Sequence, residues 1–299
     1  MKFDSTRLNK FRTSLNEKQI DVAFISDFKT IQYLTTFGSD PFERILAMLI
    51  FADQDPFVFA PALEEQVILN TGWPFAVYPY QDDQDGMTML MNQIKVRNTN
   101  PLKVGTEKAN ITADKYERLM NEFNEADFTE NITPIIEHQK LFKETDEIAK
   151  LIQAGRDADL AFEAGFKALE AGKTELQIAA ALEYATKLRN VPEMSFGTLV
   201  QGGAHAADPH GETSSRVLKE NELVLFDLGT VYEGYISDAT RTVSLGEPTD
   251  FMREIHSIVL EAQLAAQDAV KPGIAAAELD SVARDVITNA GYGQYFIHR

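Results

Sequence analysis

Residues 222–243 of the 299-residue chain read ELVLFDLGTVYEGYISDATRTV, and the rest of the sequence is best understood from this stretch. β-Branched and aromatic residues on both sides of Glu233-Gly234 predict two strands that are joined by a tight turn. Glycine adopts the positive φ that such a turn requires, and the length of the loop sets the register of the strands. A two-residue loop at Glu233-Gly234 would pair Tyr232 with Tyr235.

Asp227 interrupts the apolar run 223–228, which by itself predicts a buried strand. The two-residue loop would pair Asp227 with Thr240 and make Asp238 its diagonal neighbour, whereas a loop one residue earlier would place the two aspartates directly opposite each other. Both carboxylates share one face in either register, because side chains alternate along a strand. Two buried like charges are costly, so they require a shared proton or a divalent cation. A simpler alternative is that Asp227 bonds a backbone amide and Asp238 merely follows a turn.

The composition is typical of a soluble two-domain protein, with 44% hydrophobic and 25% charged residues. No apolar run is long enough for a membrane-spanning helix, and the first residues lack the apolar core of a signal peptide. The chain has no cysteine, which excludes disulfides and thiolate metal sites and favours the cytoplasm. A formal net charge of −18 argues against nucleic acid or an anionic membrane as a partner.

The order of helical and strand patterns predicts an α/β (α+β) fold with a mixed sheet in the first part of the chain. Helices are expected at 5–18, 62–70, 87–95 and 112–125, and strands at 20–25, 45–52, 56–60, 75–80 and 103–105. A connection at 132–139 divides the chain into a predicted N-terminal domain, 1–131, and a second domain, 140–299. Long helices are expected in the second domain from Thr145, over 174–188, over 251–270 and over 276–289.

Two of the five histidines lie in the segment 195–211, where a strand ends in a glycine pair and a loop follows. Pro209 and Gly211 restrict the backbone on both sides of His210, which makes His210 the better candidate for a functional role. We expect His205 to be an ordinary surface side chain.

The pattern Asp227-Leu228-Gly229, followed by SDATRT at 237–242, resembles the first two metal ligands of the pita-bread metallopeptidases. This family includes methionine aminopeptidase, aminopeptidase P and prolidase, and its two aspartates are also eleven residues apart. The order of elements before residue 131 and the segment GSDPFER at 38–44 resemble the N-terminal domain of the creatinase and prolidase branch. KLFKETDEI at 140–148 and the segment from 271 to 284 resemble its catalytic domain.

The resemblance implies a creatinase-like N-terminal domain with a mixed sheet and a pita-bread catalytic domain, closest to the bacterial Xaa-Pro dipeptidases (prolidases). Such an enzyme is a metal-dependent exopeptidase, which hydrolyses Xaa-Pro dipeptides through a hydroxide that bridges two divalent ions. Asp227 would bind one ion, Asp238 would bridge both, and His210 would hold the substrate or the developing tetrahedral species. The ligand chemistry suits Mn²⁺, Co²⁺ or Zn²⁺, and we expect Mn²⁺. Family members pair as homodimers, and we expect residues 40–44 near that contact.

Two alternatives to a prolidase share this fold. Aminopeptidase P removes the first residue from longer X-Pro peptides, but the length of the predicted N-terminal domain is closer to that of the bacterial prolidases. A metal-free creatinase-like or binding protein is the second alternative, and the presence of both aspartates within SDATRT speaks against it.

The family pattern also sets an expectation for the end of the chain, which reads Tyr295-Phe296-Ile297-His298-Arg299. In the family, the corresponding His-Arg pair leads into a glycine-rich segment whose histidine is the third metal ligand, and two glutamate ligands follow later. The resemblance therefore implies an incomplete, C-terminally truncated pita-bread domain. We expect residues 1–299 alone to be inactive, and the longer protein to be the dipeptidase.

Overall fold

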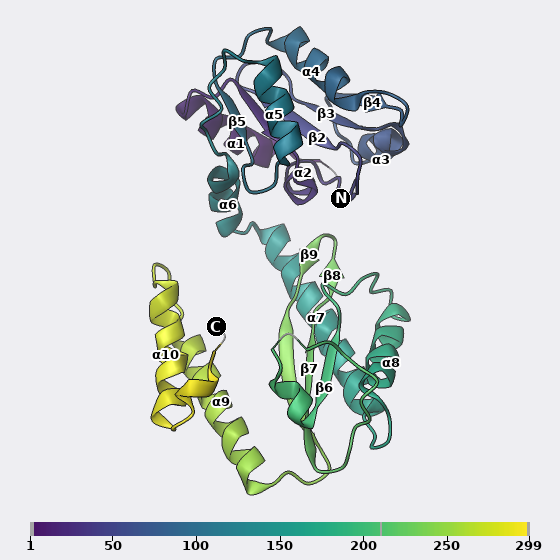
Figure 1. Cartoon of the computed structure of the whole chain (residues 1–299), viewed down its shortest axis with the longest axis vertical. Helices are drawn as coiled ribbons and strands as arrows, with labels where there is room; N and C mark the ends of the chain where they lie inside the picture. The colour runs from purple at the N-terminus through teal and green to yellow at the C-terminus, as the bar shows by residue number, and fades with distance from the viewer. Residues whose placement is uncertain (1–2, 210, 298–299) are drawn as a thin grey trace. The chain divides into compact units, whose positions relative to one another are not determined.

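The computed structural model describes residues 3–209 and 211–297, and these residues form two compact units. The first unit comprises Met1–Glu144 and the second comprises Thr145–Arg299. In Figure 1 the first unit runs from purple to teal, and the second runs from teal to yellow. Each unit has its own sheet and its own apolar core.

The first unit is built on a five-stranded sheet with the strand order β4-β3-β2-β1-β5. Its strands are β1 (Val22–Ile25), β2 (Ala47–Phe51), β3 (Phe57–Pro61), β4 (Ala76–Tyr80) and β5 (Val104–Thr106). The β1–β5 and β3–β4 pairs are parallel, and the β1–β2 and β2–β3 pairs are antiparallel. The sheet is therefore mixed, as the sequence predicts.

Helices cover both faces of this sheet (Figure 1). They are α1 (Ser5–Glu17), α2 (Phe28–Thr35), α3 (Glu65–Asn70), α4 (Gly86–Arg97), α5 (Ala113–Glu122) and α6 (Thr133–Leu141), with a 3₁₀ turn at Ala62–Glu64. One apolar cluster joins Ile50 of β2 to helices α1, α2 and α6. A second cluster joins the preceding residue, Leu49, to α4 and α5. Neighbouring residues of one strand thus enter different cores, because successive side chains point to opposite faces of a sheet.

The segment between the two predicted domains is more ordered than a linker. Residues 132–139, which we predicted as the connection, fall on helix α6 and on the residue before it. Ile132 and Ile136 are buried in the core of the first unit, and Pro134 occupies the first turn of the helix. Proline is well tolerated at that position, since its missing N–H would have no partner inside the helix. The burial of these isoleucines attaches α6 to the first unit.

The second unit contains three small groups of elements. Two helices, α7 (Thr145–Ala168) and α8 (Glu175–Lys187), precede a three-stranded sheet with the order β10-β7-β6. Its strands are β6 (Leu199–Gly202), β7 (Glu222–Leu228) and β10 (Ala239–Leu245), and a short ladder of β8 (Val231–Tyr232) with β9 (Tyr235–Ile236) lies between β7 and β10 in the chain. Helices α9 (Asp250–Ala269) and α10 (Ala276–Asn289) follow, with 3₁₀ turns at Gly203–Ala207 and Gly293–Tyr295.

The central strand of the three-stranded sheet, β7, is fully buried on only one face. Val224, Phe226 and Leu228 of β7 pack in the core formed with α7 and α8. Gly165 of α7 makes room for the Phe226 ring, because a Cβ on this glycine would lie 2.8 Å from the ring. The intervening side chains of β7, Asp227 among them, are only partly buried. The predicted buried strand is thus buried on one face and partly buried on the other, because an apolar run does not reveal how many faces are covered.

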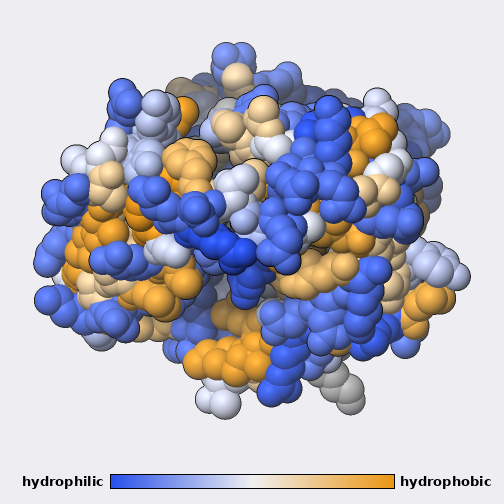
Figure 2. Space-filling model, turned by 90° about the horizontal axis from the view of Figure 1, so that it is seen from below, coloured by the Kyte–Doolittle hydropathy of each residue, from blue (hydrophilic) through white to orange (hydrophobic). Residues whose placement is uncertain are grey.

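Helices α9 and α10 pack against each other but leave much apolar surface open. Val259, Leu260 and Leu264 of α9 are exposed, and Ala262 is the one residue of α9 described as buried. Surface of this kind is visible in orange among blue polar surface in Figure 2. Within residues 3–209 and 211–297, no helix has both the length and the apolar character needed to cross a membrane.

Candidate metal centre

The two candidate aspartates are brought together by a close crossing of the chain. A Cβ on Gly229 would overlap the carbonyl oxygen of Ser237, so only glycine lets the two segments approach this closely. The amide of Thr230 donates to Ser237 Oγ at 3.0 Å, and the amide of Ser237 donates to the carbonyl of Thr230 at 3.0 Å. Ser195 Oγ donates to Ser237 O at 2.9 Å from a third segment. The crossing fixes the backbone two and three residues after Asp227 and directly before Asp238.

The turn beyond the crossing has the predicted form. Glu233 and Gly234 have φ values of 47° and 84°, so both central residues are in the left-handed region that a type I′ hairpin turn requires. Tyr232 pairs with Tyr235, which confirms the predicted two-residue loop. The hairpin is anchored on α7, where Tyr235 donates its hydroxyl to the buried Glu147 at 2.8 Å.

The register of the longer strands also follows the prediction, with Asp227 paired with Thr240. Asp238 lies just before β10 and is exposed, so it is outside the strand ladder. Burial raises the pKa of the Asp227 carboxyl above its usual value, the Thr240 side chain opposes this shift, and the negative charge of Asp238 adds to it. The two carboxylates therefore interact electrostatically across the space between β7 and the start of β10.

Asp227 has the signature of a carboxylate that needs a further partner. Its Oδ1 atom is buried and has no hydrogen-bond partner among the described residues. Leaving such an oxygen unpaired is costly, and a nearby second carboxylate increases the cost when both are ionised. A divalent cation would satisfy both groups, because carboxylate oxygens are the ligands that such cations prefer. The residues present therefore fit a metal ion at this position.

The described residues supply only part of a full ligand set. Within 3–209 and 211–297, no group of three or more histidine, cysteine, aspartate or glutamate side chains lies close enough together to hold a metal ion. His210, the candidate substrate-binding residue, lies outside the described residues. Asp227 and Asp238 are thus the ligand candidates that the structure describes, as two members of a larger set.

The loop that precedes this centre is held by a residue that the sequence did not single out. Glu175, the first residue of α8, has a fully buried side chain that accepts from the Gly202 amide at 2.9 Å and from the Ser214 amide at 3.1 Å. Its carboxylate also lies 3.0 Å from Nδ1 of His205. The sequence does indicate the position of Glu175 in its helix. Thr174 and Gln177 form the capping box of α8, which makes Glu175 the first residue of that helix.

His205 is therefore not the free surface residue that we expected. Its side chain is 24% exposed and is paired with the buried Glu175 carboxylate. Sequence reasoning missed this pair because its members are thirty residues apart, and no local pattern links them. Burial alone would raise the pKa of Glu175, but the hydrogen bonds from His205, Gly202 and Ser214 together hold it below its usual value.

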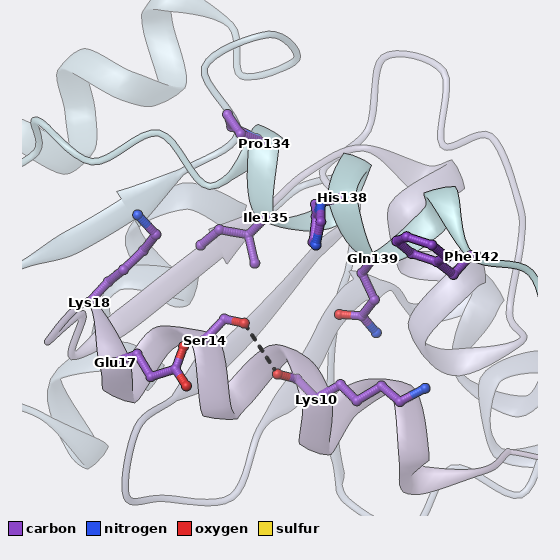
Figure 3. A pocket seen from close by; sticks show the side chains of 9 residues that line it. All are labelled: Lys10, Ser14, Glu17, Lys18, Pro134, Ile135, His138, Gln139 and Phe142. Atoms are coloured by element: carbon purple, nitrogen blue, oxygen red, sulfur yellow. Dashed lines mark hydrogen bonds between the residues drawn. The ribbon is translucent and has the colours of Figure 1, made fainter. Parts of the chain in front are cut away.

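A separate groove of about 480 Å³ lies between α1 and α6 of the first unit (Figure 3). Its lining consists of Lys10, Ser14, Glu17, Lys18, Pro134, Ile135, His138, Gln139 and Phe142. Several polar groups here already have partners. Lys10 Nζ lies 2.9 Å from Glu144, and Gln139 Nε2 donates to the Arg7 carbonyl at 2.9 Å. The groove does not carry the carboxylate chemistry that the second unit presents.

Comparison with protein families matches both units of the chain. Residues 7–141 match the creatinase/prolidase N-terminal domain, and residues 149–299 match metallopeptidase family M24. The two matches together span nearly the whole chain, and both agree with the resemblance seen in the sequence.

Individual relatives agree with these families. The chain is 45% identical to the Xaa-Pro dipeptidase of Lactobacillus delbrueckii subsp. lactis over 293 residues, which are 98% of this chain and 80% of the relative. The prolidase structure from Pyrococcus horikoshii OT3 matches with a TM-score of 0.88 and 29% identity, over 98% of this chain and 80% of that one. The X-Pro aminopeptidase structure from Thermotoga maritima MSB8 matches with a TM-score of 0.86 and 28% identity, over 96% and 78%. The likeness to these structures confirms the predicted fold class.

Proposed function

Because the chain belongs to metallopeptidase family M24 and carries a creatinase/prolidase N-terminal domain, we propose that it hydrolyses Xaa-Pro dipeptides in a metal-dependent reaction. The substrate proposal rests on the Lactobacillus relative, which is named an Xaa-Pro dipeptidase and is 45% identical over 98% of this chain.

We assign Asp227 and Asp238 as ligands of divalent ions, for which we propose Mn²⁺. The observation that carries this assignment is the buried, unpartnered Oδ1 of Asp227 beside a second carboxylate. When bound, such ions would polarise the scissile carbonyl and make a water molecule a stronger nucleophile near neutral pH. The contribution of the chain is to hold the two carboxylates close together, through the crossing at Gly229 and Ser237.

We assign to His210 the role of holding the substrate by a hydrogen bond. Support comes from its sequence context, since Pro209 limits the backbone before it and Gly211 follows in a buried position. A hydrogen bond from an imidazole to the substrate would orient the reacting carbonyl and stabilise the charge that develops on it.

The assignment is tested by replacing each aspartate with asparagine in the protein expressed from its complete coding sequence. We expect Asp227→Asn and Asp238→Asn each to lower the turnover of Leu-Pro by at least about 10²-fold, the loss typical of one charge-stabilising group. Mn²⁺ affinity, measured by calorimetry, should fall in parallel. Asp159→Asn on the exposed face of α7 is the matched control and should change neither quantity. Normal turnover by the Asp227 or Asp238 variant would overturn the assignment.

An X-Pro aminopeptidase activity is the second candidate, because the Thermotoga X-Pro aminopeptidase has a similar fold. The two activities are separated by substrate length. A dipeptidase cleaves Leu-Pro and leaves longer peptides such as Leu-Pro-Gly-Gly intact, whereas an X-Pro aminopeptidase cleaves the longer peptide. Preferential cleavage of the longer peptide would reverse our order of preference.

We further propose that the protein is a cytoplasmic homodimer, with residues 40–44 near the contact between subunits. The cysteine-free composition suits a reducing compartment. Phe42 is 82% exposed, and its backbone is held at a φ of 53° by a hydrogen bond from its amide to Asp40. Aromatic side chains are enriched among the residues that anchor interfaces. Light scattering should show a dimer that Phe42→Ser weakens, and a monomer at all concentrations would contradict this proposal.

A further inference from the structure

The loop 203–214 connects β6 to the segment that leads into β7, and one carboxylate holds both of its ends. Glu175 Oε1 accepts from the amide of Gly202, directly before the loop. Glu175 Oε2 accepts from the amide of Ser214 at 3.1 Å and from its hydroxyl at 2.8 Å, at the other end. Because the Glu175 side chain is fully buried, these bonds are shielded from competing water.

His205 extends this arrangement from the ends of the loop to its middle. Its Nδ1 lies 3.0 Å from both oxygens of Glu175, and an ionised carboxylate only accepts hydrogen bonds, so Nδ1 carries the proton. The opposite nitrogen, Nε2, faces Gly211, since a Cβ built on that glycine would lie 3.2 Å from it. The imidazole thus spans the distance between the buried carboxylate and the backbone at residue 211.

Gln201 closes the other side of the same glycine. Its side chain is 2% exposed, and a Cβ on Gly211 would overlap Gln201 Nε2. Two turn contacts are described in this part of the loop, from Asp208 N to His205 O and from Gly211 N to Asp208 O, each of 3.1 Å. Gly211 is therefore enclosed by His205, Gln201 and the turn at Asp208.

We propose that His205 is a positioning residue that, together with Glu175, fixes the backbone on both sides of position 210. This inference rests on the proposed function, in which the histidine at position 210 contacts the substrate. Small displacements of a substrate-positioning group are expensive in catalysis, since a misplacement of about 1 Å can lower the rate about 10²-fold. The charge-assisted bond from His205 to Glu175 reduces such displacements without contacting the substrate.

The test compares three variants of the complete, Mn²⁺-loaded protein. His205→Ala removes the bond to Glu175, and His205→Asn retains a donor close to the position of Nδ1. His256→Ala removes an exposed histidine on α9 and is the matched control. We expect His205→Ala to lower kcat for Leu-Pro by about 10- to 100-fold. KM and metal content should stay within about threefold of the wild-type values, His205→Asn should recover most of the loss, and His256→Ala should match the wild type.

Hydrogen exchange provides a second readout that does not depend on activity. In His205→Ala, the amides of Asp208 and Gly211 should exchange at least about tenfold faster, because the turns that they close open more often. The amides of Gly202 and Ser214 should remain protected, since they donate directly to Glu175. His205→Asn should restore the slow exchange.

The possible results separate this inference from the proposed function. If the wild type cleaves no Xaa-Pro peptide, the proposed function fails, and with it the catalytic role of His205. If the wild type is active and His205→Ala has normal kcat or normal exchange in the loop, only the positioning role is overturned. A variant that loses metal or melts at a much lower temperature would show a purely structural role, which also contradicts the inference.

Discussion

The two larger sheets of this protein are made of similar apolar strands but are covered differently. In the first unit, β1, β2 and β3 are buried along their whole length, with helices on both faces. In the second unit, β7 alternates between buried and partly buried residues, because α7 and α8 cover only one face. Of the two, only the sheet with an open face presents a candidate ligand pair, which suggests that an uncovered face is what makes a strand carboxylate available for chemistry.

The largest effect is expected where the second sheet depends on close backbone contact. Gly229→Ala would push the added methyl group into Ser237 O, which is backbone and cannot turn away. We expect a loss of about 3 kcal/mol or more in the stability of the second unit, together with loss of activity. Hydrogen exchange should show the first unit unaffected.

A second glycine in the same unit is a matched control for this substitution. Gly155 lies in α7, and a Cβ there would contact nothing within 4 Å. Gly155→Ala should therefore be neutral or stabilise the unit by up to about 1 kcal/mol, because alanine favours the helix. Equal destabilisation by Gly155→Ala and Gly229→Ala would show that the crossing has no special role.

Pairs of neighbouring core residues test the difference in covering directly. In the first unit, Leu49→Ala and Ile50→Ala should each cost about 2–5 kcal/mol, since each side chain lies in its own core. In the second unit, Phe226→Ala should cost about 3–5 kcal/mol, whereas Leu225→Ala on the open face should cost no more than about 1–2 kcal/mol. Denaturant titration gives the values, and similar costs for Phe226 and Leu225 would show that the open face is covered in solution.

A smaller difference between the two units is expected in how two buried glutamates, one in each unit, make stability depend on pH. Burial raises the pKa of Glu107 in the first unit, despite hydrogen bonds from the amides of Ser26 and Asp27. Its contribution to stability is thus present below the pKa of the unfolded chain and is lost as pH rises through the folded-state pKa. The lowered pKa of Glu175 has the opposite effect, because its contribution is present above the unfolded pKa and is lost as pH falls through the folded-state pKa.

Glutamine variants turn this contrast into a measurement. The stability of Glu107→Gln relative to the wild type should be higher at pH 7 than at pH 4, because at pH 7 the wild type holds a buried charge. Glu175→Gln should lose more stability relative to the wild type at pH 7 than at pH 4. Hydrogen exchange resolved by unit measures both, and parallel pH trends for the two variants would contradict the assigned pKa directions.

The smallest effect is expected at the hairpin tip, which no core covers. Glu233 has a φ of 47°, a conformation that asparagine tolerates better than glutamate, and Asn-Gly is the favoured pair in this turn type. The replaced carboxylate lies 3.9 Å from Lys150, a partly exposed pair of modest value. Glu233→Asn should therefore raise stability by about 0.5 kcal/mol, measured by thermal unfolding. Destabilisation would show that the contact with Lys150 outweighs the relief of backbone strain.

The sequence predicts best those features that depend on local pattern. The turn at Glu233-Gly234, the pairing of Asp227 with Thr240 and the mixed sheet of the first unit all follow from alternation and turn chemistry. The hairpin register is unambiguous once the loop length is known, because a shift by one residue would turn every side chain to the other face.

Features that depend on distant parts of the chain could not be predicted in this way. Residues 132–139 were predicted as a connection, and the attachment of α6 depends on Ile136 meeting a core built from other segments. The bond between Glu175 and His205 has no local signature. The roles of Asp227, Asp238 and His210 remain predictions that the proposed variants test.

The crossing at Gly229 and Ser237 also divides the hairpin into two parts. The segments that carry the aspartates must keep their length, and the tip need not. The aspartates lie on one side of it, and the tip 231–236 lies on the other. Residues added between Glu233 and Gly234 would lengthen the tip without altering the distance between the aspartates, provided that Tyr235 keeps its bond to Glu147. The length of the tip then sets the spacing of eleven residues between the aspartates in the sequence. The crossing, and not this spacing, sets the distance between the two carboxylates. An epitope or a fluorescent peptide could therefore be inserted at this turn to label the second unit. The insertion would lie close in sequence to both carboxylates, but the crossing would keep it from moving them.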